Sequence, residues 1–247
     1  MARTGAAQTD GAFQLGKPEL VCRWRLAGAR LPLENRHLRA LGRRHVNSGE
    51  MDKALVAWAK QHIEWTLADG GALHPDGVLM LIVDESGRAA MTVGPHKPLA
   101  CRSTSALIAR ARESWYEGLV TGVSPESVWI VSEGTLVWGI PEDSAPSGAT
   151  SLVEDLARTL GIPVERSKSL LDDLDNGELG YDEFFLVSDE HGIVRAADAP
   201  GSEGERFQRS YERLLDQVRR GRLRFHIAKI FSDEAKVQAM RADFLSE

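Results

Sequence analysis

Apolar and polar residues follow two different periods along this 247-residue chain. Short apolar or alternating runs, typical of strands, cover residues 21–29, 77–83, 88–93, 127–131, 135–139, 183–188 and 193–195. Apolar residues spaced near 3.6, typical of amphipathic helices, recur over residues 34–41, 51–67, 103–116, 151–160, 169–174, 203–220 and 232–244. The mixture predicts an α/β protein of the α+β type.

Residues typical of turns and helix caps mark the boundaries between these elements. Asp84-Glu85-Ser86-Gly87 and Ser132-Glu133-Gly134 lie between paired strand runs and predict two hairpins. Gly94-Pro95-His96-Lys97-Pro98 predicts a linker, because two prolines disfavour both a helix and a central strand. Ser151-Leu152-Val153-Glu154 has the form of a capping box, which predicts a helix beginning at Ser151.

We therefore expect four parts. They are a flexible tail (1–20), a small N-terminal α/β domain (21–98), a larger C-terminal α/β domain (99–221) and a helical extension (222–247).

Composition and charge exclude several classes of function. A net charge of −6 without a basic run gives no electrostatic footprint for nucleic acid. Cys22 and Cys101 lie far apart and form no disulfide framework, as expected of a cytoplasmic protein. No apolar stretch approaches the length of a membrane span, and the seven histidines show no metal-ligand spacing. We expect no nucleic-acid partner, no membrane insertion and no metal.

Several strings, in order and spacing, resemble the class IV aminotransferases, the family of branched-chain and D-amino-acid aminotransferases and aminodeoxychorismate lyase. Residues 127–137 (SVWIVSEGTLV) resemble the family hairpin "SNVFLVKDGRLV", and residues 147–150 (SGAT) fall on its "PGIT" turn. Residues 156–164 (LARTLGIPV) resemble "LARELGIPV", and residues 182–186 (DEFFL) resemble "ADEVFLT". The resemblance covers about residues 21–220 and implies a small domain followed by a larger one, a homodimer and a cleft for pyridoxal phosphate (PLP).

The family's chemistry depends on a lysine that binds PLP covalently, within a pattern like "KTxNYLxxVLA". The matching stretch here is Cys101-Arg102-Ser103-Thr104, so Arg102 or Cys101 stands where the lysine is expected. A guanidinium stays protonated and does not replace an amine that condenses with an aldehyde. Lys97 lies four or five residues earlier, and we keep it as the alternative cofactor lysine.

The other cofactor contacts of the family are altered too. In His37-Leu38-Arg39-Ala40-Leu41, which resembles "HLxRL", Ala40 replaces the phosphate arginine and Arg39 is one residue away. Gly122 stands at the position where the family has the carboxylate that faces the pyridinium nitrogen of PLP. Glu126 is the acidic residue close by. The second phosphate turn, usually Thr-Gly-Thr, is Val187-Ser188-Asp189, where an aspartate would repel a phosphate. The turn Gly148-Ala149-Thr150 before a helix keeps an anion site or is a plain capped start.

These observations give three functional hypotheses. The leading one is an enzyme that works without PLP on a small amino- or carboxylate-bearing metabolite in the interdomain cleft. Its candidate catalytic residues are Cys101 as nucleophile and His96 as base, with Lys97 beside them, and Arg102 binds a carboxylate or phosphate together with the turn at 148–150. The further candidates are Gly148, Ala149, Thr150 and Ser188 around the anion site, and Arg39, Trp115, Trp129 and Trp138 for the substrate. The alternatives are a PLP-dependent aminotransferase or lyase using Lys97, and a non-catalytic protein that binds a ligand or partner.

Overall fold

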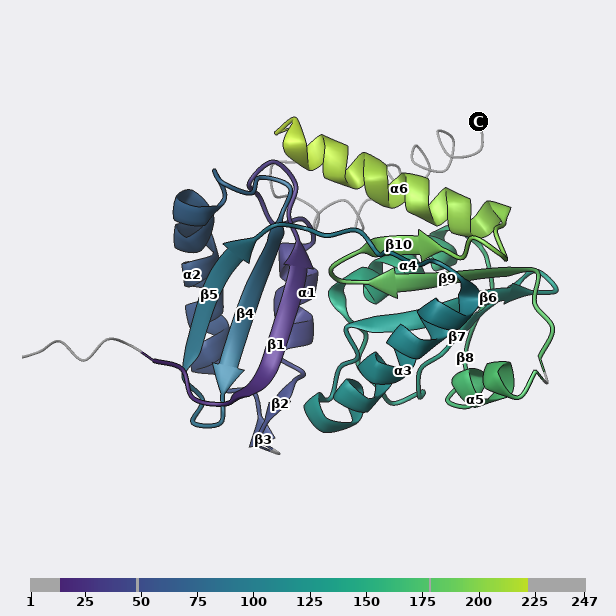
Figure 1. Cartoon of the computed structure of the whole chain (residues 1–247), viewed down its shortest axis with the longest axis horizontal. Helices are drawn as coiled ribbons and strands as arrows, with labels where there is room; N and C mark the ends of the chain where they lie inside the picture. The colour runs from purple at the N-terminus through teal and green to yellow at the C-terminus, as the bar shows by residue number, and fades with distance from the viewer. Residues whose placement is uncertain (1–13, 48, 178, 222–247) are drawn as a thin grey trace, which may run out of the picture.

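The computed structural model describes residues 14–47, 49–177 and 179–221, and it divides them between two sheets (Figure 1). The first sheet has the order β1-β4-β5 and is antiparallel throughout. Its strands are β1 (Pro18–Arg25), β4 (Val78–Asp84) and β5 (Ala89–Gly94). The same part of the chain contains the helices α1 (Glu34–Leu41) and α2 (Lys53–Gly70), together with the short strand pair β2 (His45–Val46) and β3 (Gly49–Glu50). We call this part the N-terminal lobe.

The second sheet has five strands in the order β10-β9-β6-β7-β8. They are β6 (Glu126–Ser132), β7 (Thr135–Trp138), β8 (Val164–Arg166), β9 (Glu183–Ser188) and β10 (Gly192–Arg195). All pairs are antiparallel except β7 with β8, which is parallel. The helices of this C-terminal lobe are α3 (Thr104–Thr121), α4 (Gly148–Leu160), α5 (Leu170–Asp175) and α6 (Ser202–Arg219).

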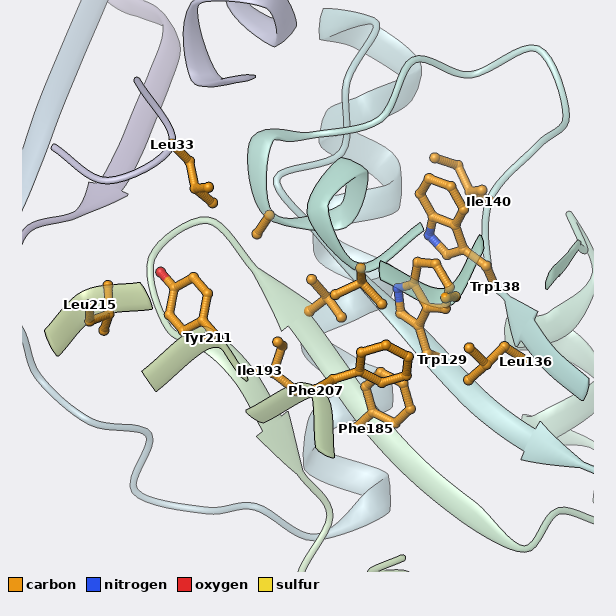
Figure 2. Packing of buried hydrophobic residues seen from close by; sticks show 14 of the residues in the cluster. Leu33, Trp129, Leu136, Trp138, Ile140, Phe185, Ile193, Phe207, Tyr211 and Leu215 are labelled. Atoms are coloured by element: carbon orange, nitrogen blue, oxygen red, sulfur yellow. The ribbon is translucent and has the colours of Figure 1, made fainter. Parts of the chain in front are cut away.

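Two apolar cores lie on opposite faces of the five-stranded sheet. Alternation along β6 sends Val128 and Ile130 into the core under α3 and α5, whereas Trp129 packs on the other side with α4 and α6. Trp129 and Trp138 stack with their ring centroids 4.7 Å apart, and Phe185 continues the stack (Figure 2). Burial on both faces explains why β6 and β9 read as continuous apolar runs rather than as alternating ones.

The lobes are joined by the 95–102 linker and by direct contacts. The Arg25 N–H donates to the Asp189 carbonyl (3.0 Å), which ties the end of β1 to the turn after β9. Near the end of α6, Arg219 pairs with Asp76 (2.7 Å). Figure 1 shows α6 along one edge of the second sheet, with its C-terminal end reaching over the N-terminal lobe.

Most predicted elements are confirmed, and four details differ. The α4 helix begins at Gly148 rather than at Ser151, because Ser147 is the N-cap and its Oγ accepts from the Thr150 N–H. The first strand begins at Pro18 and ends at Arg25, and α3 continues to Thr121. The strands β2, β3 and β8 were not predicted. The helix predicted for residues 232–244 lies outside the described residues.

Candidate functional site

The turn after β9 supplies side chains to two different places. In extended chain, consecutive side chains point in opposite directions. Ser188 and Glu190 line a cleft between the lobes, whereas Asp189 between them turns to the start of α4. The sequence Ser188-Asp189-Glu190 therefore serves two sites, which differ in how far their charges are already paired.

At the first site, the Asp189 carboxylate closes the N-terminus of α4. Its Oδ1 accepts the Ala149 N–H at 2.7 Å and the Ser147 hydroxyl at 3.0 Å. The carboxylate is buried, and the partial positive charge of the helix start favours an anion there. Burial alone would raise the pKa of Asp189, but the neighbouring His37 and the Ala149 N–H outweigh burial and hold this pKa below its usual value.

Helix α1 covers the same site from the N-terminal lobe. His37 Nδ1 lies 3.6 Å from Asp189 Oδ2, which is an electrostatic contact but too long for a hydrogen bond. Arg36, the residue before His37, donates to Ser151 Oγ (3.1 Å) and to Asp155 (2.8 Å) on α4. The histidine of the "HLxRL"-like string thus reaches the helix start, while Ala40 is buried and Arg39 is exposed.

The second site is a cleft of about 520 Å³ between β1 of one lobe and α3, β6 and the β9–β10 turn of the other. Its lining carries both signs of charge. The lining residues are Val21, Arg23, Lys97, Pro98, Leu99, Ala100, Arg110, Glu113, Ser114, Glu117, Pro125, Glu126, Ser188, Glu190 and His191.

One ion pair forms a fixed wall of this cleft. Arg110 donates to both carboxylate oxygens of Glu126 (2.9 and 2.7 Å), in the bidentate geometry that arginine favours. Ser188 Oγ donates to the same carboxylate (2.7 Å) and accepts the N–H groups of Glu190 and His191. These contacts hold Glu126 in place and order the turn that carries His191.

Other cleft charges have few internal partners. Arg23 and Glu190 approach only to 3.9 Å, and the structure places no ion-pair partner beside Lys97 within its described residues. Burial raises the pKa of Glu190 above its usual value, more than Arg23 lowers it. These groups remain available to a ligand.

Two histidines meet at the edge of the cleft. His96 Nε2 and His191 Nδ1 are 3.2 Å apart, so one ring donates to the other. Burial lowers the pKa of both rings, and that of His191 falls to about 4. His191 is therefore neutral near pH 7 and is able to accept a proton.

The structure brings together some of the predicted residues and separates others. Lys97 and Ser188 line the cleft, and His96 contacts it through His191. Cys101 and Arg102 are exposed and are absent from the cleft lining, because the chain here is bonded to the loop after β10, where the Ala197 N–H donates to the Arg102 carbonyl (2.8 Å). The Cys101 thiol instead lies 3.4 Å from Ser103 Oγ, and hydrogen bonding to Ser103 lowers its pKa.

The aromatic and anion-site predictions need correction. Trp129 and Trp138 are fully buried in the core, and half-buried Trp115 packs against the other core, so none of them lines the cleft. Gly148, Ala149 and Thr150 are buried at the helix start, where Asp189 already supplies the anion. The helix start that was predicted as an anion site thus holds the protein's own carboxylate.

Several residues of the two sites were not predicted: Arg23, His37, Arg110, Glu113, Glu117, Glu190 and His191. Two places carried a local signal: His37 begins the "HLxRL"-like string, and the polar residues Asp189, Glu190 and His191 follow the buried strand β9. Within the described residues, no group of acidic, histidine and cysteine side chains has the arrangement of a metal site, and no helix is long and apolar enough to cross a membrane.

The order of elements and the two-sheet arrangement define an α/β protein with the fold of the class IV aminotransferases. A fold IV transaminase from Curtobacterium pusillum superposes with a TM-score of 0.55 at 14% identity, over 85% of this chain and 91% of that chain. A hypothetical aminotransferase from Mycobacterium tuberculosis, in its apo form, gives 0.52 at 16% identity, over 80% and 87%. A protein assigned as 4-amino-4-deoxychorismate lyase from Legionella pneumophila gives 0.52 at 10%, over 83% and 97%. No protein-family model and no curated protein matches the sequence.

The cofactor implied by this fold is PLP, whose phosphate is expected at the start of α4. Here the Ala149 N–H and the Ser147 hydroxyl are already bonded to Asp189. A phosphate would meet a second anion in a buried place, and an alanine stands where the phosphate arginine is expected. The residues at this helix start therefore do not fit a phosphate group.

Proposed function

We propose that this protein is an enzyme with the class IV aminotransferase fold that acts without PLP on a small metabolite carrying an amine and a carboxylate. The observation that carries the proposal is the Asp189 carboxylate at the start of α4, because it takes the place of the cofactor's phosphate. With the cofactor's anchor filled, the open cleft offers a place for a ligand.

The charges of the cleft favour a zwitterionic ligand. Arg23 and Lys97 provide positive charge for a carboxylate, while Glu113 and Glu190 provide negative charge for an ammonium group. These four side chains are the ones with loose internal pairing, in contrast to the fixed Arg110–Glu126 pair. A ligand with both charges at once leaves fewer cleft charges unpaired than a simple amine or a simple acid does.

The same cleft contains side chains suited to proton transfer. His191 is neutral near pH 7, and the contact with His96 engages its Nδ1. In the tautomer whose Nδ1–H donates to His96, Nε2 carries the lone pair; it lies 4.0 Å from Glu190, beyond hydrogen-bond distance, and is able to take a proton from a ligand. Burial raises the pKa of Glu190, which favours its protonated form and hence the role of proton donor. We propose His191 as the base and Glu190 as the acid, with His96 positioning the His191 ring.

Ligand-dependent stabilisation of the full chain tests this proposal. Melting temperatures are measured with matched amino acids, amines and carboxylic acids, and the amino acids are expected to give the largest increase. The increase should be lost in Arg23→Gln and in Lys97→Ala. It should remain in His191→Asn, which should lose proton exchange between ligand and solvent. Equal stabilisation by all three ligand classes, or none, would contradict the proposal.

A PLP-dependent aminotransferase or lyase remains the second candidate, since Lys97 lies in the cleft together with Glu126. Incubation with PLP, borohydride reduction and peptide mapping would decide. This candidate predicts a stoichiometric label on Lys97, whereas our proposal predicts none.

A non-catalytic binding protein is the third candidate. It would show stabilisation by a ligand in the cleft but neither turnover nor proton exchange. His191→Asn would then leave every measured property of the bound complex unchanged.

We also propose that the protein is a homodimer in the cytoplasm. Apolar side chains lie exposed on two helices, with Tyr116, Leu119 and Val120 on one face of α3 and Trp65 on α2. Trp58, on the same helix as Trp65, is half-buried and stacks on His62. Light scattering should give about 54 kDa, twice the 27.1 kDa of one chain. A monomer would contradict the dimer, and a dimer lost only on truncation after Arg220 would assign the interface to residues 221–247.

A further inference from the structure

The start of α4 is built to hold an anion. The helix is 13 residues long, and its first turn directs the Ala149 N–H and the Ser147 hydroxyl to one point. The helix dipole adds partial positive charge at the same place. A capped helix start by itself is common, so a ligand site requires a second feature.

That feature is His37, whose side chain is only 3% exposed. Its Nδ1 faces the Asp189 carboxylate at 3.6 Å and has no hydrogen-bond partner among the described residues. A buried polar atom without a partner is costly, and this one is directed at the anion. The site therefore offers more hydrogen-bonding capacity than a single carboxylate uses.

Gly148 leaves space for the His37 ring. A Cβ at Gly148 would lie 2.3 Å from His37 Nδ1, so only glycine lets the imidazole approach the helix start. The ring stacks on Trp24 with a centroid distance of 5.2 Å, which fixes its direction. The place of the unpaired nitrogen is thus set by packing on both sides.

We propose that Asp189 is a tethered anion in a phosphate-binding site, and that removal of its carboxylate opens this site to free phosphate. A phosphate has more acceptor oxygens than a carboxylate and is able to satisfy His37 as well as Ala149 and Ser147. The backbone of the site would survive the change, because the Asp189 N–H donates to Pro125 and its carbonyl accepts from Arg25. This inference does not depend on the activity proposed for the cleft.

Tethering decides which ligands the protein accepts. An attached carboxylate competes at a high effective concentration with any phosphate in solution. The natural chain should therefore reject phosphorylated ligands at this helix start and leave the cleft to ligands without a phosphate.

The test measures the melting temperature of the full-length Asp189→Ser variant in inorganic phosphate and in sodium chloride of equal ionic strength. Serine removes the charge and frees the volume. We expect phosphate at ten times its dissociation constant to raise the melting temperature by about 3 °C or more relative to chloride. The natural chain should show no such difference. Asp189→Asn is the matched control, because its amide still fills the site and accepts the Ala149 N–H.

The phosphate effect should persist in Asp189→Ser combined with Lys97→Ala, since Lys97 belongs to the cleft; loss of the effect there would place the phosphate in the cleft and overturn the proposal. No effect in Asp189→Ser, or an equal effect in the natural chain, would also overturn it. If Asp189→Ser folds only when phosphate is present, the proposal is supported. Failure to fold even with phosphate, while Asp189→Asn folds, would contradict it.

Discussion

Two sites that share the turn after β9 have opposite electrostatic designs. At the start of α4, Asp189 is buried and satisfied by contacts within the chain. In the cleft, Arg23, Lys97 and Glu190 remain partly exposed and loosely paired. Charges that the fold has already paired contribute to stability, whereas charges left open contribute to binding. The comparison therefore predicts that substitutions at the helix start destabilise the fold and that substitutions in the cleft change ligand binding.

Removal of the Asp189 side chain should give the largest effect. Asp189→Ala leaves the Ala149 N–H and the Ser147 hydroxyl without their buried acceptor and removes the charge that faces His37 Nδ1, and should lower the free energy of unfolding by about 3 kcal/mol. Glu190→Gln, one residue away in the cleft, should change it by less than about 0.5 kcal/mol. Urea unfolding at neutral pH measures both. Equal losses in the two variants would remove the distinction between the sites.

A methyl group at Gly148 should have the next largest effect. Its Cβ would lie 2.3 Å from His37 Nδ1, so the α1–α4 contact must open, at a cost of about 1–3 kcal/mol. Gly180→Ala is the matched control, because nothing lies within 4 Å of a Cβ there. A thermal melt in which the two alanine variants lose the same stability would show that His37 does not pack as described.

The pH dependence of stability should give a smaller but more specific effect. The pKa of Asp189 lies below the value of about 3.9 for an unfolded aspartate, so its ionised form stabilises the fold. This contribution is complete above about pH 5 and declines as the pH falls below about 4 through the folded-state pKa. The stability gap between the natural chain and Asp189→Asn should therefore narrow on acidification. A gap that widens or stays constant in urea unfolding would contradict this assignment.

The elements that were predictable depend on local signals. The β6–β7 hairpin follows from Glu133-Gly134, both of which adopt positive φ in the turn, and α1 follows from its apolar spacing. The three-residue β8 strand was missed, because it pairs in parallel with β7 after the α4 crossover and has too few residues to show a period. The α4 start was misplaced, since Ser151 offers a capping box that competes with the Ser147 cap seen in the structure.

The sites were harder to predict than the fold. The cleft unites β1, α3 and the β9–β10 turn, which lie far apart in the sequence, so Arg23 and His191 carried no joint signal. Conversely, Cys101 and Arg102 are close to Lys97 in sequence but do not line the cleft. The sequence did indicate that Asp189 is incompatible with a phosphate. Only the fold reveals that this residue, 40 positions from Ala149, fills the helix start itself.

The most direct test of the account is the PLP content of the full-length protein, isolated from cells that supply the cofactor and treated with borohydride before mass measurement. We expect a colourless protein whose mass is that of the unmodified chain, because Asp189 is bonded at the helix start where the cofactor's phosphate is expected. A yellow protein with one PLP fixed per chain, on Lys97, would contradict it.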